Sequence, residues 1–257
     1  MRTIRSKCPP LAGILVLCLV GLAGYAFAQD PLTTMSGKRA IIKYEKSVTE
    51  SEARQALDSV HRELKSVSHQ TGVKYSGKLE VRMYGSVGKF LESTGTRQAW
   101  RGSRYVREVL HVQPVAELIR RNELDRWLAR GVAEAVLTKP GVNGCPIWLR
   151  EAYAAFHTGE TRDMRPPQGM KLTSFSDLTQ ALQDNPDPPR REDVQFVLAG
   201  TLKFLVDTFG EKRAMKLFKA FDGSSTVDVV FKKTLGEEYS AVEQKWAAHM
   251  NVVLRGK

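Results

Sequence analysis

The sequence predicts an α+β fold, with a small mixed sheet in the first half and a mainly helical second half. Short runs of alternating apolar residues end near Pro114, and helical periodicity continues from there to about residue 253. Strands that come first and helices that follow are typical of α+β domains rather than of a parallel α/β sheet. We therefore expect one domain over residues 29–257, with an α/β part at about 38–114 and a helical part at about 115–253.

The first half contains the clearest local signals. Residues 39–44, RAIIKY, predict a strand. Thr49 followed by Glu52 is a capping box, which predicts the start of a helix that runs to about Val67. The elements expected next are a half-buried strand at 78–85, a short helix at 87–93, and one or two extended segments at 103–114.

Helical periodicity continues through the second half of the chain. The segments that carry it are 115–138, 146–157, 191–209, 211–221, 225–235 and 238–253. The polar, proline-rich residues 159–191 interrupt this series, and we expect them to be irregular apart from one helical turn near Leu178.

The first 28 residues have the pattern of a secretory signal peptide. Arg2, Arg5 and Lys7 precede an apolar run from Leu11 to Ala28, which ends in AFA, an A-x-A cleavage site. We expect export to the periplasm or the extracellular space, with no membrane span left after cleavage. The alternative is an anchored protein with an uncleaved N-terminal segment, because about 18 apolar residues are at the short limit for a bilayer span.

Charge and cysteine content narrow the classes of function. The formal net charge is +11, and removal of the signal segment with its three basic residues leaves +8. The basic residues are scattered and no aromatic residues are interleaved with them, so we expect no nucleic-acid partner. Cys145 is the only cysteine after the signal segment, so no internal disulfide is expected.

Two consecutive helices in the middle of the chain carry the candidate chemistry. The first has an inward stripe at helical spacing, made of Leu124, Trp127, Leu128, Gly131, Val132, Ala135 and Val136. The second starts at Pro146 and reads IWLREAYAAF. Glu151 lies close to its apolar face, where a partly desolvated carboxylate needs a partner.

The segment PIWLREAYAAF resembles the P-x-W-L-x-E-G-x-A-x-[YF] segment of the gluzincin metallopeptidases and their peptidase-MA-like bacterial relatives. KLEVRMYGSVGKFLESTGT upstream is also similar to that family, as is the helical tail with Gly236, Tyr239, Val242, Glu243 and Trp246. The resemblance covers most of residues 38–250 and implies a zincin-like fold. In the family, the Glu of this segment is the third zinc ligand, and a preceding helix carries H-E-x-x-H, with two histidine ligands and a general base.

This sequence departs from the family at the metal site. In the alignment that we favour, Gly131 and Ala135 replace the two histidines and Val132 replaces the general base, so that only Glu151 remains. A catalytic zinc needs three protein ligands. We therefore expect no metal, no other cofactor, no catalytic residue and no hydrolysis by the family mechanism.

Two structural expectations follow for the helix that contains Gly131 and Ala135. Gly131 inside a helix indicates close approach of another segment, for which the Glu151 helix is the candidate. Glu134 is expected outside the inward stripe, as a solvated partner of Arg130. A second alignment places Glu134 at the catalytic glutamate, and Ala133 and Leu137 then replace the histidines.

Three hypotheses for function follow. The first is an exported pseudopeptidase that binds a peptide or an envelope protein, with an edge strand adding the peptide by backbone hydrogen bonds; its residues are Tyr105, Val106, Val109 and His111. The second is a cryptic metal-dependent peptidase that uses Glu151 with His111 or His157. The third is a structural envelope protein.

Overall fold

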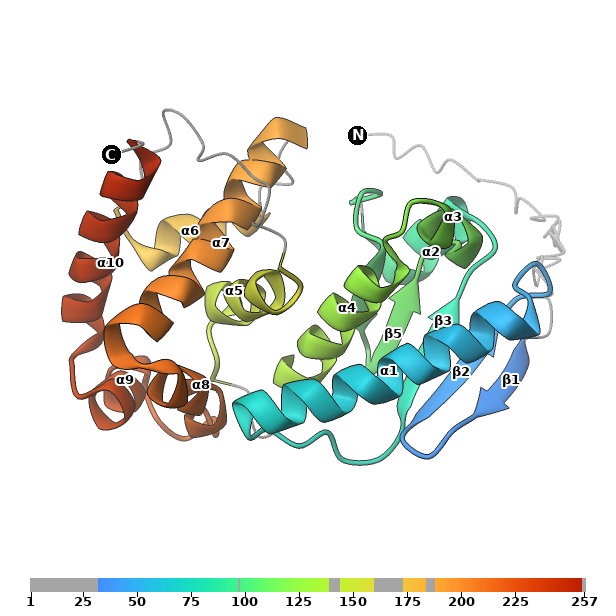
Figure 1. Ribbon diagram of the computed structural model, residues 1–257, viewed down its shortest axis with the longest axis horizontal. Coiled ribbons are helices and arrows are strands. Elements are labelled where there is room, and N and C mark those ends of the chain that lie inside the picture. The colour runs from blue at the N-terminus through green and yellow to red at the C-terminus, as the bar shows by residue number, and fades with distance from the viewer. Residues whose placement is uncertain (1–31, 97, 139–143, 160–172, 184–187, 256–257) are drawn as a thin grey trace, which may run out of the picture. The chain divides into compact units, whose positions relative to one another are not determined.

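The computed structural model describes residues 32–96, 98–138, 144–159, 173–183 and 188–255. The chain from Pro31 to Lys257 forms one compact unit, which begins with a mixed sheet and continues in helices (Figure 1). The prediction of an α+β fold with a mainly helical second half is confirmed. The predicted signal segment lies outside the described residues, and within them no helix has the length and apolarity needed to cross a membrane.

The sheet has five strands in the order β1-β2-β3-β5-β4. The three middle strands are parallel, and β1 and β4 pair antiparallel at the two edges. The described strands are β1 (Thr33–Ser36), β2 (Ala40–Tyr44), β3 (Leu79–Met83), β4 (Ser103–Val106) and β5 (Val109–Val112). The extended segment predicted before Pro114 is therefore a hairpin, whose two-residue turn places Arg107 and Glu108 at positive φ. Strand β1 was not predicted, because its sequence TTMS has no apolar alternation.

Helix α1 (Glu50–Thr71) connects the parallel strands β2 and β3, a connection that needs a long crossover. The predicted capping box is confirmed: the Thr49 hydroxyl accepts the Glu52 amide at 3.2 Å, and the Glu52 carboxylate accepts the Thr49 amide at 2.8 Å. The helix ends at Gly72, whose φ of 69° suits a left-handed cap. It thus runs past the end predicted near Val67.

Helices make up the rest of the described chain. They are α2 (Val87–Thr94), α3 (Val115–Arg120), α4 (Leu124–Thr138), α5 (Ile147–His157), α6 (Phe175–Gln183), α7 (Pro188–Phe209), α8 (Glu211–Ala220), α9 (Val227–Leu235) and α10 (Tyr239–Leu254). The segment predicted as one helix at 115–138 is two helices, because Asn122 takes a positive φ of 56° between them. Only one helical turn was expected near Leu178, but the structure has a helix of nine residues there, α6.

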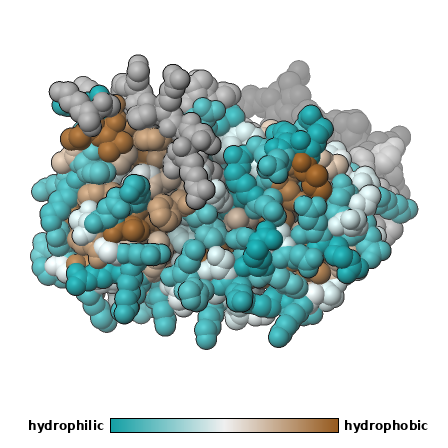
Figure 2. All heavy atoms as spheres, viewed as in Figure 1, coloured by the Kyte–Doolittle hydropathy of each residue, from teal (hydrophilic) through white to brown (hydrophobic). Residues whose placement is uncertain are grey.

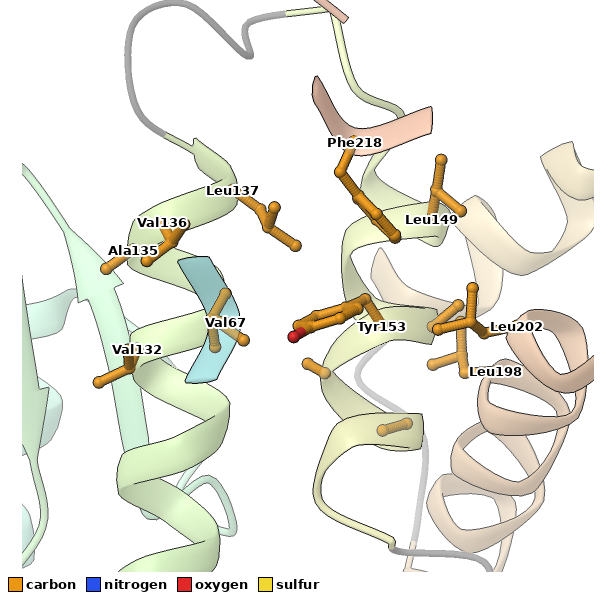
Figure 3. Close-up of a cluster of buried hydrophobic side chains, with 14 of the residues drawn as sticks. Val67, Val132, Ala135, Val136, Leu137, Leu149, Tyr153, Leu198, Leu202 and Phe218 are labelled. Carbon is orange, nitrogen blue, oxygen red and sulfur yellow. The ribbon is translucent and has the colours of Figure 1, made fainter. Parts of the chain in front are cut away.

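Helices α1 and α4 pack against each other and against the sheet, while α5 packs against both α4 and α7 (Figure 1). Buried side chains fill the space among α1, α4, α5 and α8, including Val67 of α1, Leu137 of α4, Tyr153 of α5 and Phe218 of α8 (Figure 3). On the outside, hydrophilic side chains cover most of the visible face, and hydrophobic ones gather mainly over the helical half (Figure 2). The helix α5 thus joins the sheet part to the helical part.

Two glycines allow α4 to lie close to the β4–β5 hairpin. A Cβ atom at Gly131 would lie 2.3 Å from Leu110 Cδ1 and 2.9 Å from Ser103 Oγ, and one at Gly102 would lie 2.4 Å from the Trp127 ring. The Ser103 hydroxyl also donates to the Trp127 carbonyl at 2.5 Å. The close approach predicted at Gly131 is therefore real, but the neighbour is the hairpin and not the Glu151 helix.

This packing predicts opposite effects for two glycine substitutions. Gly131→Ala is expected to lower the free energy of unfolding by up to about 2 kcal/mol, since overpacking costs about 1–3 kcal/mol and helix propensity returns about 1 kcal/mol. Gly88→Ala is the control within α2, where a Cβ atom meets nothing within 4 Å; it should stabilise by about 0.5–1 kcal/mol. Urea denaturation of both variants measures the difference. A Gly131→Ala variant that gains as much stability as Gly88→Ala would contradict this packing.

Candidate functional site

A buried cluster of charges lies where α4 meets α5. Glu151 of α5 is 9% exposed, and the two arginines that bind it, Arg130 and Arg101, are 2% and 5% exposed. Arg130 Nη2 donates to Glu151 Oε2, and Arg101 Nη1 donates to Oε1 at 3.3 Å. Arg130 Nη1 also donates to Gln195 Oε1 of α7 at 3.0 Å. Side chains from α4, α5, α7 and the segment before β4 thus meet at this cluster.

The two guanidiniums determine the charge state of Glu151. Burial would raise the pKa of this carboxyl group, but the positive charges of Arg101 and Arg130 outweigh burial and hold its pKa at about 2. The carboxylate is therefore ionised throughout the physiological pH range. The sequence predicted that Glu151 needs a partner, and Arg101 and Arg130 are its partners.

Glu134 lies one turn after Arg130 on α4, beside the same cluster. Its Oε2 atom accepts the backbone N–H of Tyr105 on β4 at 3.1 Å. Burial and the negative charge of Glu151 raise its pKa, and Arg101 and the Tyr105 amide oppose that shift. The expected solvated pair of Glu134 with Arg130 was wrong, because Arg130 is buried and bonded to Glu151.

A cavity of about 430 Å³ lies next to the cluster. Its charged lining consists of Arg101, Arg104, Arg130, Arg150, Glu134 and Glu151. Apolar atoms come from Ile147, Ala154 and Leu182, and further polar groups come from Gln98, Thr138 and Gln183. The volume lies within the range of about 300–1,000 Å³ that is typical of ligand pockets, and the lining has more positive than negative groups.

The three α4 positions taken from the H-E-x-x-H alignment do not face Glu151. Gly131 lies against Leu110 and Ser103 of the hairpin. Val132 and Ala135 are fully buried and point away from α5, toward the sheet side of α4 (Figure 3). The α4 residues that line the cavity with Glu151 are Arg130, Glu134 and Thr138, at helical spacing on another face of the helix.

The residues expected on a peptide-binding edge are divided between two strands. Tyr105 and Val106 lie on β4, which is at the edge of the sheet, whereas Val109 and His111 lie on β5, between β3 and β4. On β4, the Tyr105 N–H already donates to Glu134. Only Tyr105 and Val106 therefore lie on an edge strand, and the Tyr105 N–H already has the Glu134 carboxylate as its acceptor.

The two histidines considered as metal ligands are bonded elsewhere. His111 Nδ1 lies 2.7 Å from the Tyr84 hydroxyl oxygen and the two rings stack, while burial lowers the pKa of His111 to about 4. His157 Nε2 lies 2.9 Å from Glu63 Oε2. Neither histidine lines the cavity beside Glu151. Within the described part of the chain, no group of three His, Cys, Asp or Glu residues is arranged to hold a metal ion.

Comparison with known proteins finds no family model and no curated protein that matches this chain. The resemblance to the gluzincins therefore stays a prediction. Sequence reasoning identified Glu151 but none of the arginines around it. The available signal was Arg130 itself, because a charged residue inside a buried apolar helix is almost always paired.

The cluster predicts that Glu151→Gln destabilises the protein at neutral pH. Two buried guanidiniums would lose their counter-charge, so we expect a loss of about 3 kcal/mol. The Glu151 pKa is depressed from 4.5 to about 2, so its contribution is present above 4.5 and disappears as the pH falls toward 2. Denaturation at stepped pH should show the two proteins converging over this window. Glu117→Gln, which removes an exposed pair on α3, is the control and should have little effect.

Glu134 predicts a pH dependence of the opposite sign. Its raised pKa means that the ionised carboxylate is disfavoured in the folded state. Glu134→Gln keeps an oxygen acceptor for the Tyr105 amide and removes the charge next to Glu151. We therefore expect a higher free energy of unfolding at neutral pH, with a gain that vanishes below the ordinary pKa of 4.5. The same titration measures it, and a destabilised variant at neutral pH would show that the charge of Glu134 is favourable.

Proposed function

We propose that this chain is an exported, non-catalytic relative of the gluzincin metallopeptidases, which binds a peptide in the cavity beside Glu151. The observation that carries the proposal is the buried Arg130–Glu151–Arg101 cluster. Both oxygens of Glu151 accept hydrogen bonds from guanidiniums, which leaves the carboxylate poorly placed to bind a divalent cation. The signal-peptide pattern at residues 1–28 supports export.

The geometry favours an alignment one residue earlier than the one that the sequence favoured. Helix α4 corresponds to the metal-binding helix of the family, and α5 to the helix that carries the third ligand. Arg130 and Glu134, at positions i and i+4, take the places of the two histidines. The Arg130 guanidinium then supplies, beside Glu151, the positive charge that a metal ion supplies in the family.

Binding in the cavity is favoured over addition of a peptide strand to β4. A peptide carbonyl that approached the Tyr105 amide would have to displace the Glu134 carboxylate. The cavity instead offers volume, four arginines and three apolar side chains next to the cluster. In this proposal the chain keeps a peptidase-like cleft, which binds a peptide without hydrolysing it.

Reconstruction of a zinc site tests the relation to the metallopeptidases. The double variant Arg130→His/Glu134→His is expected to bind one zinc ion per chain, with Glu151 as the third protein ligand. The natural chain is expected to keep no zinc after dialysis and to hydrolyse no peptide in the presence of added zinc. Elemental analysis of the dialysed proteins and calorimetric titration with zinc measure the binding.

Two matched variants control this experiment. Adding Glu151→Gln to the double variant removes the third ligand and should abolish stoichiometric zinc. Glu134→His alone supplies one histidine and leaves Arg130 bonded to Glu151, so it should bind no stoichiometric zinc. A folded double variant without zinc would refute the alignment of α4. Peptide hydrolysis by the natural chain that disappears in Glu151→Gln would refute the non-catalytic function.

A further inference from the structure

We propose that the cavity beside Glu151 binds the free carboxylate at the C-terminus of a peptide, through the guanidiniums of Arg104 and Arg150. The inference rests on the proposed function and names the ligand group that the site recognises. Its starting point is the surplus of N–H donors on the arginines that line the cavity.

The arginines of the cavity have many more donors than acceptors. Each guanidinium has five N–H groups, yet those of Arg101, Arg104 and Arg150 donate, among the described residues, to only four acceptors: Glu151 Oε1, Thr96 Oγ1, Gln98 Oε1 and Thr138 Oγ1. The buried Nε atoms of all three side chains have no hydrogen-bond partner. These Nε atoms are buried from solvent, so the donors left for a ligand with acceptor oxygens are the remaining Nη–H groups.

Arg104 and Arg150 are the two guanidiniums available to an anion. Neither forms an ion pair with a residue of the described ranges, whereas Arg101 and Arg130 both bind Glu151. Neutral groups hold both side chains in place: Gln98 accepts from Arg104 at 3.2 Å, and Thr138 accepts from Arg150 at 2.7 Å. The two side chains are therefore held in position without a direct ion pair. The charge of Glu134 acts on Arg104, but the four arginines of the lining outnumber its two carboxylates, which favours an anionic ligand.

The rest of the lining selects the kind of anion. Ile147, Ala154 and Leu182 contribute apolar side chains to the same cavity, so the ligand should have an apolar body beside its charged end. The C-terminal residue of a peptide has this form when its side chain is apolar. A carboxylate is planar and matches the fork of a guanidinium through two parallel hydrogen bonds. Capture of a terminal carboxylate is also a known mode of peptide recognition.

Calorimetric titration of the full mature chain tests the inference. The probe is an N-acetylated tripeptide of two alanines and a C-terminal leucine, as the free acid and as the amide. We expect the acid to bind at least tenfold more tightly than the amide. Arg104→Gln/Arg150→Gln should weaken binding of the acid by about 10- to 100-fold, the value of one or two charged hydrogen bonds. Arg120→Gln, at an exposed arginine of α3, should leave the affinity unchanged.

Further probes separate the sources of an anion. An amidated tripeptide with a glutamate side chain tests whether any carboxylate suffices, and inorganic phosphate tests whether any anion does. Equal binding of either one to the site would overturn the assignment to a terminal carboxylate. Equal affinity of acid and amide, no binding of either, or no effect of the double glutamine variant would also overturn it.

The variants can be checked for folding independently. Arg104→Lys/Arg150→Lys keeps both charges and loses the planar fork, so it should retain part of the affinity for the acid. Near-ultraviolet circular dichroism shows whether each variant keeps its packing. Zinc binding by Arg130→His/Glu134→His does not depend on a peptide carboxylate. If the acid peptide does not bind, the relation to the metallopeptidases is therefore unaffected. If the double histidine variant binds no zinc, the carboxylate site is likewise unaffected.

Discussion

The contact between Arg130 and Glu151 is the constraint on which the middle of this molecule depends. It ties α4, which packs on the sheet, to α5, which packs on α7. Removing two charges from water is costly, so such a pair adds little net stability compared with apolar residues of similar volume. Its effect is geometric, since the charges are satisfied only when Arg101 and Gln195 are also in place. One arrangement of four segments meets that condition.

Helix α4 has different requirements on its two sides. Toward the sheet it needs small residues, because the hairpin lies so close that Gly131 has no room for a side chain. Toward α5 it carries Arg130 and Glu134, which line a cavity instead of filling it. Apolar packing on the first side fixes the helix, and this lets the second side hold charged groups in defined positions. The candidate site thus depends on a glycine that does not belong to it.

The sequence predicted the elements of the fold better than it predicted the faces of α4. Local signals such as the Thr49–Glu52 capping box and the apolar alternation of β3 depend on neighbouring residues, and the structure confirms both. The break at Asn122 had no such signal, because neither glycine nor proline marks it. In α4, 11 of the 15 residues are buried, including Arg130, so an apolar stripe cannot tell which side meets the sheet.

The candidate site was predicted only in part for the same reason. Glu151 was identifiable as a carboxylate near an apolar face, and it does need partners. Those partners are distant in sequence: Arg101 precedes β4 and Gln195 lies on α7. Pairing across such separations depends on the packing of whole elements, which single-sequence periodicity does not encode.

The bond between Glu134 and the Tyr105 amide has a consequence for the behaviour of the chain in solution. Strand β4 ends the sheet, and an open strand edge is a template on which a second copy can pair and start an aggregate. Natural sheets protect such edges with charges or with covering segments. Here α4 lies along the strand, and its carboxylate takes an outward-facing amide. A second copy would have to displace the partly buried Glu134 carboxylate to pair with β4. This contact therefore disfavours self-association through the strand edge.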